Sequence, residues 1–210
     1  MVAVELLNID CMEYMRGLPD KAFDLAIVDP PYGIETRGNA QDRFSAGMQL
    51  KTVNDSKPDD AYFAELFRVS RNQIIWGYNW LSDMLPMCRE FIFWYKEQHV
   101  VTFSAGELAW SSFQRTAKCF HYRFENAAID NKGAKVHPTQ KPVKLYEWLL
   151  QNYAKQGERI LDTHLGSGSS AIAAHYGGFD FVGCELDTDY YNAAKQRFEQ
   201  ATAQLAMFGA

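Results

Sequence analysis

An apolar strand pattern ends at an acid and two prolines in the run Phe23-Asp24-Leu25-Ala26-Ile27-Val28-Asp29-Pro30-Pro31-Tyr32. Because proline donates no backbone hydrogen bond, the strand must end there. The prolines also hold Asp29 and Tyr32 in an extended turn at the strand's carboxyl end, which is the edge where open α/β sheets bind ligands. A rigid turn with an exposed acid is the alternative interpretation. The run therefore predicts an α/β fold, with Asp29 at its ligand-binding edge.

Near the other end of the chain, a second strand pattern runs into a glycine-rich turn. Residues 159–162 precede the sequence Thr163-His164-Leu165-Gly166-Ser167-Gly168-Ser169, and a helical pattern follows. Glycines permit a tight turn and a close approach to a ligand, and Ser169 or Ser170 can cap the helix. The next strand ends at Glu185, 17 residues after Gly168, near the position of a ribose-binding acid in dinucleotide folds. This spacing favours a nucleoside site over a plain turn.

A third pattern, His137-Pro138-Thr139-Gln140-Lys141-Pro142, precedes a predicted helix. Pro142 suits the first turn of that helix, and Thr139 can cap it. Taken alone, this pattern indicates only the start of a helix.

Together the three patterns resemble the amino-methyltransferase family that methylates exocyclic amino groups of DNA bases with S-adenosylmethionine. Their order is similar to the beta group of that family, in which the cofactor-binding half comes last. The resemblance covers essentially the whole chain, including residues 6–11 and 107–110. It implies a Rossmann-like methyltransferase domain with a circularly permuted motif order. We therefore expect a mostly parallel, twisted sheet with helices on both faces.

The resemblance implies methyl transfer to the N6 amino group of adenine in DNA. Asp29 and the carbonyl of Pro30 would accept the two amino hydrogens, which localises the nitrogen lone pair for attack on the methyl group. Pro31 completes the rigid turn. Tyr32 would stack on the flipped base, and Phe44 would form a second wall.

The resemblance also implies a cofactor site drawn from both ends of the chain. Asp10 and Cys11 would lie at the adenine, Glu185 at the ribose hydroxyls, and Thr139 with Lys141 at the methionine carboxylate. Many relatives have Pro-Phe where this chain has Thr163-His164, so we expect His164 to replace the aromatic contact. The predicted cofactor-binding residues are Asp10, Cys11, Asp29, Thr139, Lys141, Asp162, His164, Gly166, Ser167, Gly168, Ser169, Glu185 and Leu186.

Composition is consistent with one catalytic domain over residues 1–210, 47% of them hydrophobic. No signal-peptide pattern or membrane-length apolar run occurs, so no membrane partner is expected. The four cysteines are dispersed, which disfavours a metal site and fits reduced thiols in a cytoplasmic protein. Strands are predicted near residues 2–7, 23–28, 73–76, 90–95, 107–110, 159–162 and 179–184, and helices near 11–17, 59–70, 79–85, 143–156, 169–177 and 188–206.

Two segments are predicted to serve DNA recognition. Residues 34–58 form a long irregular stretch after the Asp-Pro-Pro-Tyr motif, which is typical of a lid or DNA-binding loop. Only residues 111–136 are available as a target-recognition segment, where relatives have a larger insertion. A short or relaxed target site is therefore expected, and a homodimer would supply more contact area.

Charge is distributed unevenly along this acidic chain. The whole chain carries −5, but residues 111–148 contain seven Lys/Arg and three acids. This segment predicts a phosphate-contacting strip, with a solvated basic face as the alternative. The DNA-binding residues predicted from the strip are Arg115, Lys118, Arg123, Lys132 and Lys135.

Other functions remain open at this point. The target could be cytosine N4, RNA or a protein glutamine amide. The chain could also be a non-catalytic subunit that binds S-adenosylmethionine, although the intact Asp29 and glycine-rich turn weigh against that.

The basic strip yields a test by charge reversal. Replacing Lys132 and Lys135 with Glu should weaken DNA binding and reduce its salt slope by up to about two units, because two phosphate contacts are lost. Fluorescence titrations at several salt concentrations would measure both quantities, and calorimetry should show unchanged cofactor binding. An unaltered slope would mean that DNA docks elsewhere, with residues 34–58 the next place to test.

Overall fold

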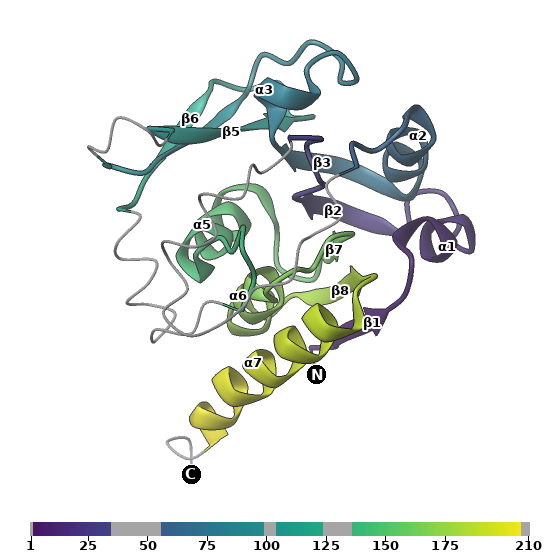
Figure 1. Cartoon of the computed structure of the whole chain (residues 1–210), viewed down its shortest axis with the longest axis vertical. Helices are drawn as coiled ribbons and strands as arrows, with labels where there is room; N and C mark the ends of the chain where they lie inside the picture. Colours follow the sequence, from purple (N-terminus) through teal and green to yellow (C-terminus); the bar gives the residue numbers. More distant parts are fainter. Residues whose placement is uncertain (1, 35–55, 99–103, 124–135, 207–210) are drawn as a thin grey trace.

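The computed structural model describes residues 2–34, 56–98, 104–123 and 136–206. Their strands form one eight-stranded sheet in the order β1-β8-β7-β2-β3-β5-β4-β6 (Figure 1). Only β5 runs antiparallel to its neighbours, β3 and β4. The expected mostly parallel α/β sheet is therefore confirmed. The strands are β1 (Val4–Asn8), β2 (Phe23–Val28), β3 (Ser70–Trp76), β4 (Ile92–Tyr95), β5 (Gly106–Ser111), β6 (Lys118–His121), β7 (Arg159–Asp162) and β8 (Asp180–Glu185).

Helices cover both faces of the sheet, as Figure 1 shows. Leu145 and Leu149 of α5 and Ala173 of α6 belong to the hydrophobic cluster on one face. Met15 of α1 and Leu66 of α2 belong to the cluster on the other face. Burial on both faces explains why residues 25–28 of β2 are all apolar rather than alternating with polar residues. The helices are α1 (Cys11–Arg16), α2 (Asp60–Val69), α3 (Tyr78–Leu81), α5 (Val143–Tyr153), α6 (Ser169–Gly177) and α7 (Thr188–Ala206).

The helix starts correct two local expectations. The helix α5 begins directly after Pro142, so Thr139 is not its cap. The helix α6 begins after Gly168, which makes Ser169 and Ser170 its first helical residues rather than its caps. Asp10, in contrast, caps α1, because its carboxylate accepts hydrogen bonds from the backbone amides at positions 12 and 13.

Other differences concern short elements. The four-residue strand β6 has only Phe120 buried, so it lacks the periodic signal that marks a strand. The helix α3 is shorter than predicted, and Pro86 lies a few residues beyond it, where it disfavours helical backbone. Within the described ranges no helix has the length and apolarity to cross a membrane. Residues 35–55 of the predicted loop and residues 124–135 of the predicted recognition segment lie outside the described residues.

Candidate active site

The two motif-bearing strands lie side by side at the switch point of the sheet. Strand β2 pairs in parallel with β7. From β7 the chain continues to β8 on one side, and from β2 it continues to β3 on the other. Because successive connections leave in opposite directions, the carboxyl ends of β2 and β7 mark the position where open α/β sheets bind ligands. Asp29 follows one of these strands, and the glycine-rich turn follows the other.

An acidic residue lies at the carboxyl end of each of four neighbouring strands. In spatial order along the sheet, β1 is followed by Asp10, β8 ends in Glu185, β7 ends in Asp162, and β2 is followed by Asp29. The fold thus brings together four residues from distant parts of the sequence. A row of carboxylates suits a positively charged ligand that also offers hydroxyl donors.

The turn after β7 is fastened to the end of β8. Gly166 and Gly168 have φ angles of 52° and 74°, which favour glycine. The amide of Gly166 donates to Oε2 of Glu185 at 2.9 Å, and the amide of Asp187 donates to Oε1 at 3.0 Å. Burial raises the pKa of Glu185, although these amides lower it.

Asp162 is buried within this turn, where it is 1% exposed. Its carboxylate accepts from the amide of His164 at 3.0 Å and from Oγ of Ser170 at 2.6 Å. Burial raises the pKa of Asp162 to about 7, assisted by the charges of Asp29 and Glu185 and opposed by the two hydrogen bonds. The end of β7 therefore carries a carboxyl group whose charge changes near neutral pH.

Both oxygens of Asp29 have a donor. The hydroxyl of Tyr32 donates to Oδ1, and Nζ of Lys141 donates to Oδ2. Burial and the charge of Asp29 raise the pKa of Tyr32 well above its ordinary value, so the phenol remains a donor. The ammonium of Lys141 contacts Asp29 and lies 3.2 Å from Oε2 of Glu107. Its predicted contact with the cofactor's carboxylate stays a prediction.

The ring of Tyr32 lies against the backbone of Gly77, at the carboxyl end of β3. Gly77 has a φ angle of 81°, and a Cβ added there would lie 2.1 Å from Cε1 of Tyr32. Such an approach is possible only without a side chain at position 77. Gly77 therefore helps to fix the motif tyrosine, and sequence analysis did not identify it.

Comparison with known proteins agrees with this geometry. The sequence model of a DNA methylase family, whose name covers N6 and N4 methyltransferases, matches residues 71–196, more than half of the chain. The chain belongs to this DNA methylase family.

Relatives match over nearly the whole length of this methylase. An Escherichia coli K12 protein provisionally named as the methylase YubD is 28% identical, with 94% of this chain and 90% of that protein covered. The structure of M1.HpyAVI with SAM superposes with a TM-score of 0.64 at 18% identity, covering 92% of this chain and 99% of that one. The cytosine-N4-specific PvuII methyltransferase gives a TM-score of 0.63 at 13% identity, covering 97% and 91%. These structures share the Rossmann-like fold of the methylase.

His164, which the resemblance predicts to replace the family's aromatic contact, lies in the turn after β7. Its Nδ1 lies 2.9 Å from Oγ1 of Thr163, and the Thr163 hydroxyl lies 2.7 Å from the hydroxyl of Tyr62. The rings of Tyr62 and His164 meet edge to face, with centroids 5.5 Å apart. Burial lowers the pKa of His164 to about 4, so the imidazole is neutral at pH 7. Burial likewise raises the pKa of Cys11 to about 12, so its thiol is protonated.

Serines of the turn connect three segments of the methylase. Oγ of Ser169 donates to the carbonyl of Lys141 at 2.7 Å. Nη1 of Arg197 donates to the carbonyl of Ser167 at 2.7 Å and contacts Oγ of Ser169 at 2.9 Å. Sequence analysis did not assign Arg197 to the site; the signal in the sequence is a cation on an otherwise apolar helix face.

Two other predicted cofactor residues lie at the margin of the site. Leu186, which follows Glu185, is 65% exposed. Oγ1 of Thr139 lies 3.1 Å from Nδ1 of His137. Neither contacts Asp29 or Asp162 among the interactions that the structure describes, and both assignments stay predictions.

The structure separates the predicted DNA-binding residues. Arg115 pairs with Glu90 at 3.3 Å, and Nζ of Lys118 donates to Asn152 at 2.7 Å. Both lie at the amino end of β6, opposite the acidic edge. Arg123 follows the carboxyl end of β6 and pairs with Glu97. Arg115 and Lys118 are therefore not beside the site.

The other three predicted DNA-binding residues, Phe44, Lys132 and Lys135, lie outside the described residues. DNA contact by any of the six predicted residues stays a prediction.

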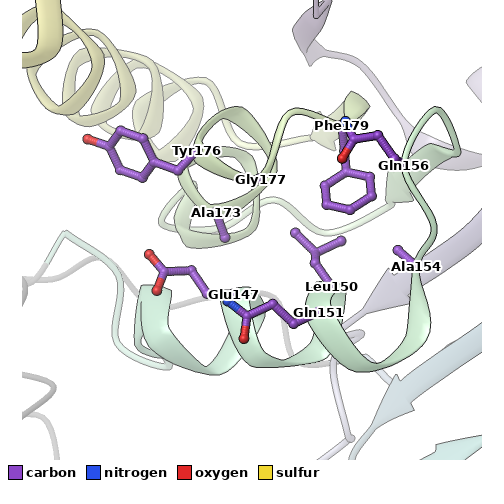
Figure 2. Close-up of a pocket in the computed structure, with 9 residues that line it drawn as sticks. All are labelled: Glu147, Leu150, Gln151, Ala154, Gln156, Ala173, Tyr176, Gly177 and Phe179. Carbon is purple, nitrogen blue, oxygen red and sulfur yellow. The ribbon is translucent and has the colours of Figure 1, made fainter.

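A groove of about 510 Å³ lies between α5 and α6, away from the acidic edge (Figure 2). No residue predicted from sequence to bind cofactor or DNA lines it. Its lining residues are Glu147, Leu150, Gln151, Ala154, Gln156, Ala173, Tyr176, Gly177 and Phe179.

The Tyr32 contact can be tested with a matched pair of glycine variants. Gly77→Ala should lower the free energy of unfolding by about 1–3 kcal/mol and impair catalysis, because the new methyl group both strains the backbone and displaces the ring. Gly157→Ala is the control, since Gly157 has a φ angle of 86° but nothing lies within 4 Å of an added Cβ. Denaturant unfolding and activity assays should show a loss of activity for Gly77→Ala alone. Equal activity losses would contradict a role in placing Tyr32.

Asp162 should make stability dependent on pH. Its folded pKa of about 7 lies above its ordinary 3.8, so the folded state binds the proton more tightly than the unfolded chain. Stability should therefore fall as pH rises between these values, by up to about 1.4 kcal/mol per pH unit. Urea unfolding from acidic to neutral pH should show a shallower decline for Asp162→Asn than for the wild type. Identical slopes would contradict this assignment.

Proposed function

We propose that the protein is a DNA adenine-N6 methyltransferase that uses S-adenosylmethionine. The observation that carries the proposal is the position of Asp29-Pro30-Pro31-Tyr32, which borders the glycine-rich turn of β7 at the switch point of the sheet. Membership of the DNA methylase family supports it. M1.HpyAVI, a protein of the same fold, forms a crystalline complex with SAM, which also supports it.

The residues at the acidic edge fit this cofactor chemically. S-adenosylmethionine supplies a methyl group on a positively charged sulfur. Asp162 and Glu185 have raised pKa values, partly because each lies near other acids, so a cation among them would relieve repulsion. Glu185 would accept from the ribose hydroxyls, with Asp10 and Cys11 at the adenine. Gly166 and Gly168 would allow a close approach of the backbone.

Asp29 and Pro30 would prepare the target amino group. The lone pair of an exocyclic amino nitrogen is delocalised into the base, which makes the nitrogen a poor nucleophile. A carboxylate oxygen and a carbonyl oxygen that accept its two hydrogens favour a pyramidal nitrogen with a localised lone pair. The hydroxyl of Tyr32 now donates to Oδ1 of Asp29, so the amino group would share or replace that hydrogen bond. The Tyr32 ring would stack on the flipped base.

Adenine is preferred because the motif begins with aspartate, which in the beta group mostly accompanies adenine. Cytosine N4 is the second candidate, since the cytosine-N4-specific PvuII enzyme has the same fold. Nucleoside analysis of methylated product would distinguish them. Duplex DNA, single-stranded DNA and RNA should be assayed in parallel, and N6-methyladenine in DNA is the expected product. N4-methylcytosine, or methylation of RNA alone, would contradict the proposal.

Substitutions of two acids should separate catalysis from cofactor binding. Asp29→Ala should abolish methyl transfer with nearly unchanged cofactor affinity. Glu185→Ala should weaken cofactor binding by about 1–3 kcal/mol, because hydrogen bonds to a charged acceptor are lost. Calorimetry and methyl-transfer assays would measure both effects. Asp24→Ala, on β2 at the opposite edge of the sheet, is the matched control and should change neither. The reverse pattern for Asp29 and Glu185 would overturn the assignment.

A further inference from the structure

Strand direction brings an additional carboxylate to the active edge. Glu107 lies near the amino end of β5, the antiparallel strand, and pairs in register with Trp94 near the carboxyl end of β4. Because β5 runs opposite to its neighbours, its amino end lies at the edge where the parallel strands have their carboxyl ends. Glu107 therefore lies on the same edge as Asp29, although it is distant from it in sequence.

Glu107 contacts the lysine that holds Asp29. Its Oε2 lies 3.2 Å from Nζ of Lys141, and its Oε1 accepts from Nζ of Lys96. The side chain of Lys141 is only 4% exposed and that of Asp29 is 14% exposed. Oε2 of Glu107 is close enough to Lys141 for an ion pair, but the geometry does not make a hydrogen bond. The ammonium of Lys141 donates its hydrogen bond to Asp29 instead. Charges thus alternate along a row in which Lys141 is buried and the other three side chains are partly exposed: Asp29, Lys141, Glu107 and Lys96.

Burial makes this arrangement depend on both carboxylates. Burial lowers the pKa of Lys141, but the charges of Asp29 and Glu107 together raise it above its ordinary value. Burial likewise raises the pKa of Glu107, yet Lys141 and Lys96 hold it at about 2. An ammonium group with so little solvent exposure stays charged only while it is paired with a carboxylate. With Glu107 neutral, Asp29 alone would compensate Lys141.

We propose that Glu107 is a positioning residue of the methyl-transfer reaction, which acts through Lys141 to hold the carboxylate of Asp29 in place beside the target amino group. This inference rests on the proposed function. Lys141 donates to Oδ2 of Asp29. Oδ1 can therefore accept an amino hydrogen of the target base after the hydroxyl of Tyr32 stops donating to it. In this proposal Lys141 belongs to the catalytic apparatus.

Other titratable groups around Lys141 belong to the same environment. The phenol of Tyr32 lies 3.5 Å from Nζ of Lys141. Tyr146 of α5 is affected by the charges of Asp162, Asp29 and Glu107, and burial raises its pKa well above the ordinary value. Among the described residues, Asp29, Tyr32 and Glu107 contact Lys141. Lys96, Tyr146 and Asp162 interact with these partners of Lys141.

The test compares two carboxylates that are each paired with a basic side chain. Glu107→Gln removes the charge next to Lys141 with little change in shape. Glu90→Gln is the matched control, because Glu90 is 0% exposed and paired with Arg115 at the opposite edge of the sheet. Glu107→Asp retains the charge. Stopped assays across a pH range would give kcat, the KM for cofactor and the alkaline limb of the kcat profile.

Glu107→Gln should lower kcat by about tenfold or more, with the KM for cofactor nearly unchanged. Its alkaline limb should move to lower pH by about one unit, because Lys141 loses its proton more readily. Glu107→Asp should restore the position of the limb, and Glu90→Gln should keep the wild-type profile. A wild-type profile in Glu107→Gln, or the same change in both Gln variants, would overturn the proposal.

A second measurement needs no methyl transfer, so it separates this inference from the proposed function. Lysine side-chain NMR of the protein without cofactor would follow the Nζ signal of Lys141, assigned by its loss in Lys141→Met. Its titration should move to lower pH in Glu107→Gln but not in Glu90→Gln. An unmoved titration would refute the role of Glu107 even if DNA methylation is observed, and a moved one would support it even if the substrate is not DNA.

Discussion

The parallel pairing of β2 with β7 is the contact on which the active edge depends. The pairing is short, with Leu25 opposite Ile160 and Ala26 opposite Leu161, yet it joins segments separated by most of the chain. It places Asp29 next to Asp162, and it is where the connections diverge to the two sides of the sheet. A shift of one residue in this register would turn the side chains of one strand to the opposite faces and separate the two acids.

The amino-terminal strand completes the site from the other side. Strand β1 pairs with β8, next to the strand of the glycine-rich turn, rather than with β2, which follows it in the chain. The amide of Ala3 donates to Asp180 at 2.8 Å, and Nδ2 of Asn8 donates to the carbonyl of Glu185 at 2.9 Å. Asp10 is thereby carried next to Glu185. Residues from early and late parts of the sequence meet in one site because β8 lies between β1 and β7.

Electrostatics divides the active edge into two regions. Around Asp162 and Glu185, carboxylates face one another, and burial together with neighbouring charge raises both pKa values. Around Asp29, the carboxylate is compensated by Lys141, which Glu107 supports. The first region favours a cationic ligand, and the second holds an acceptor that is paired with an ammonium group. This difference suits a reaction in which a cationic donor and a neutral amino group must meet at one edge of the sheet.

The sequence by itself determined the α/β class, most strand and helix positions, and the acids at the strand ends, because these follow from local apolar runs and from proline and glycine. It did not reveal β6, whose four residues bury only Phe120 and depend on pairing with β4. The sequence also did not predict the partners of Lys141. Asp29 lies 112 residues away in the chain, and Glu107 reaches the same edge only because β5 runs antiparallel. Tertiary structure decided these contacts, since strand order and direction determine which distant charges are buried together.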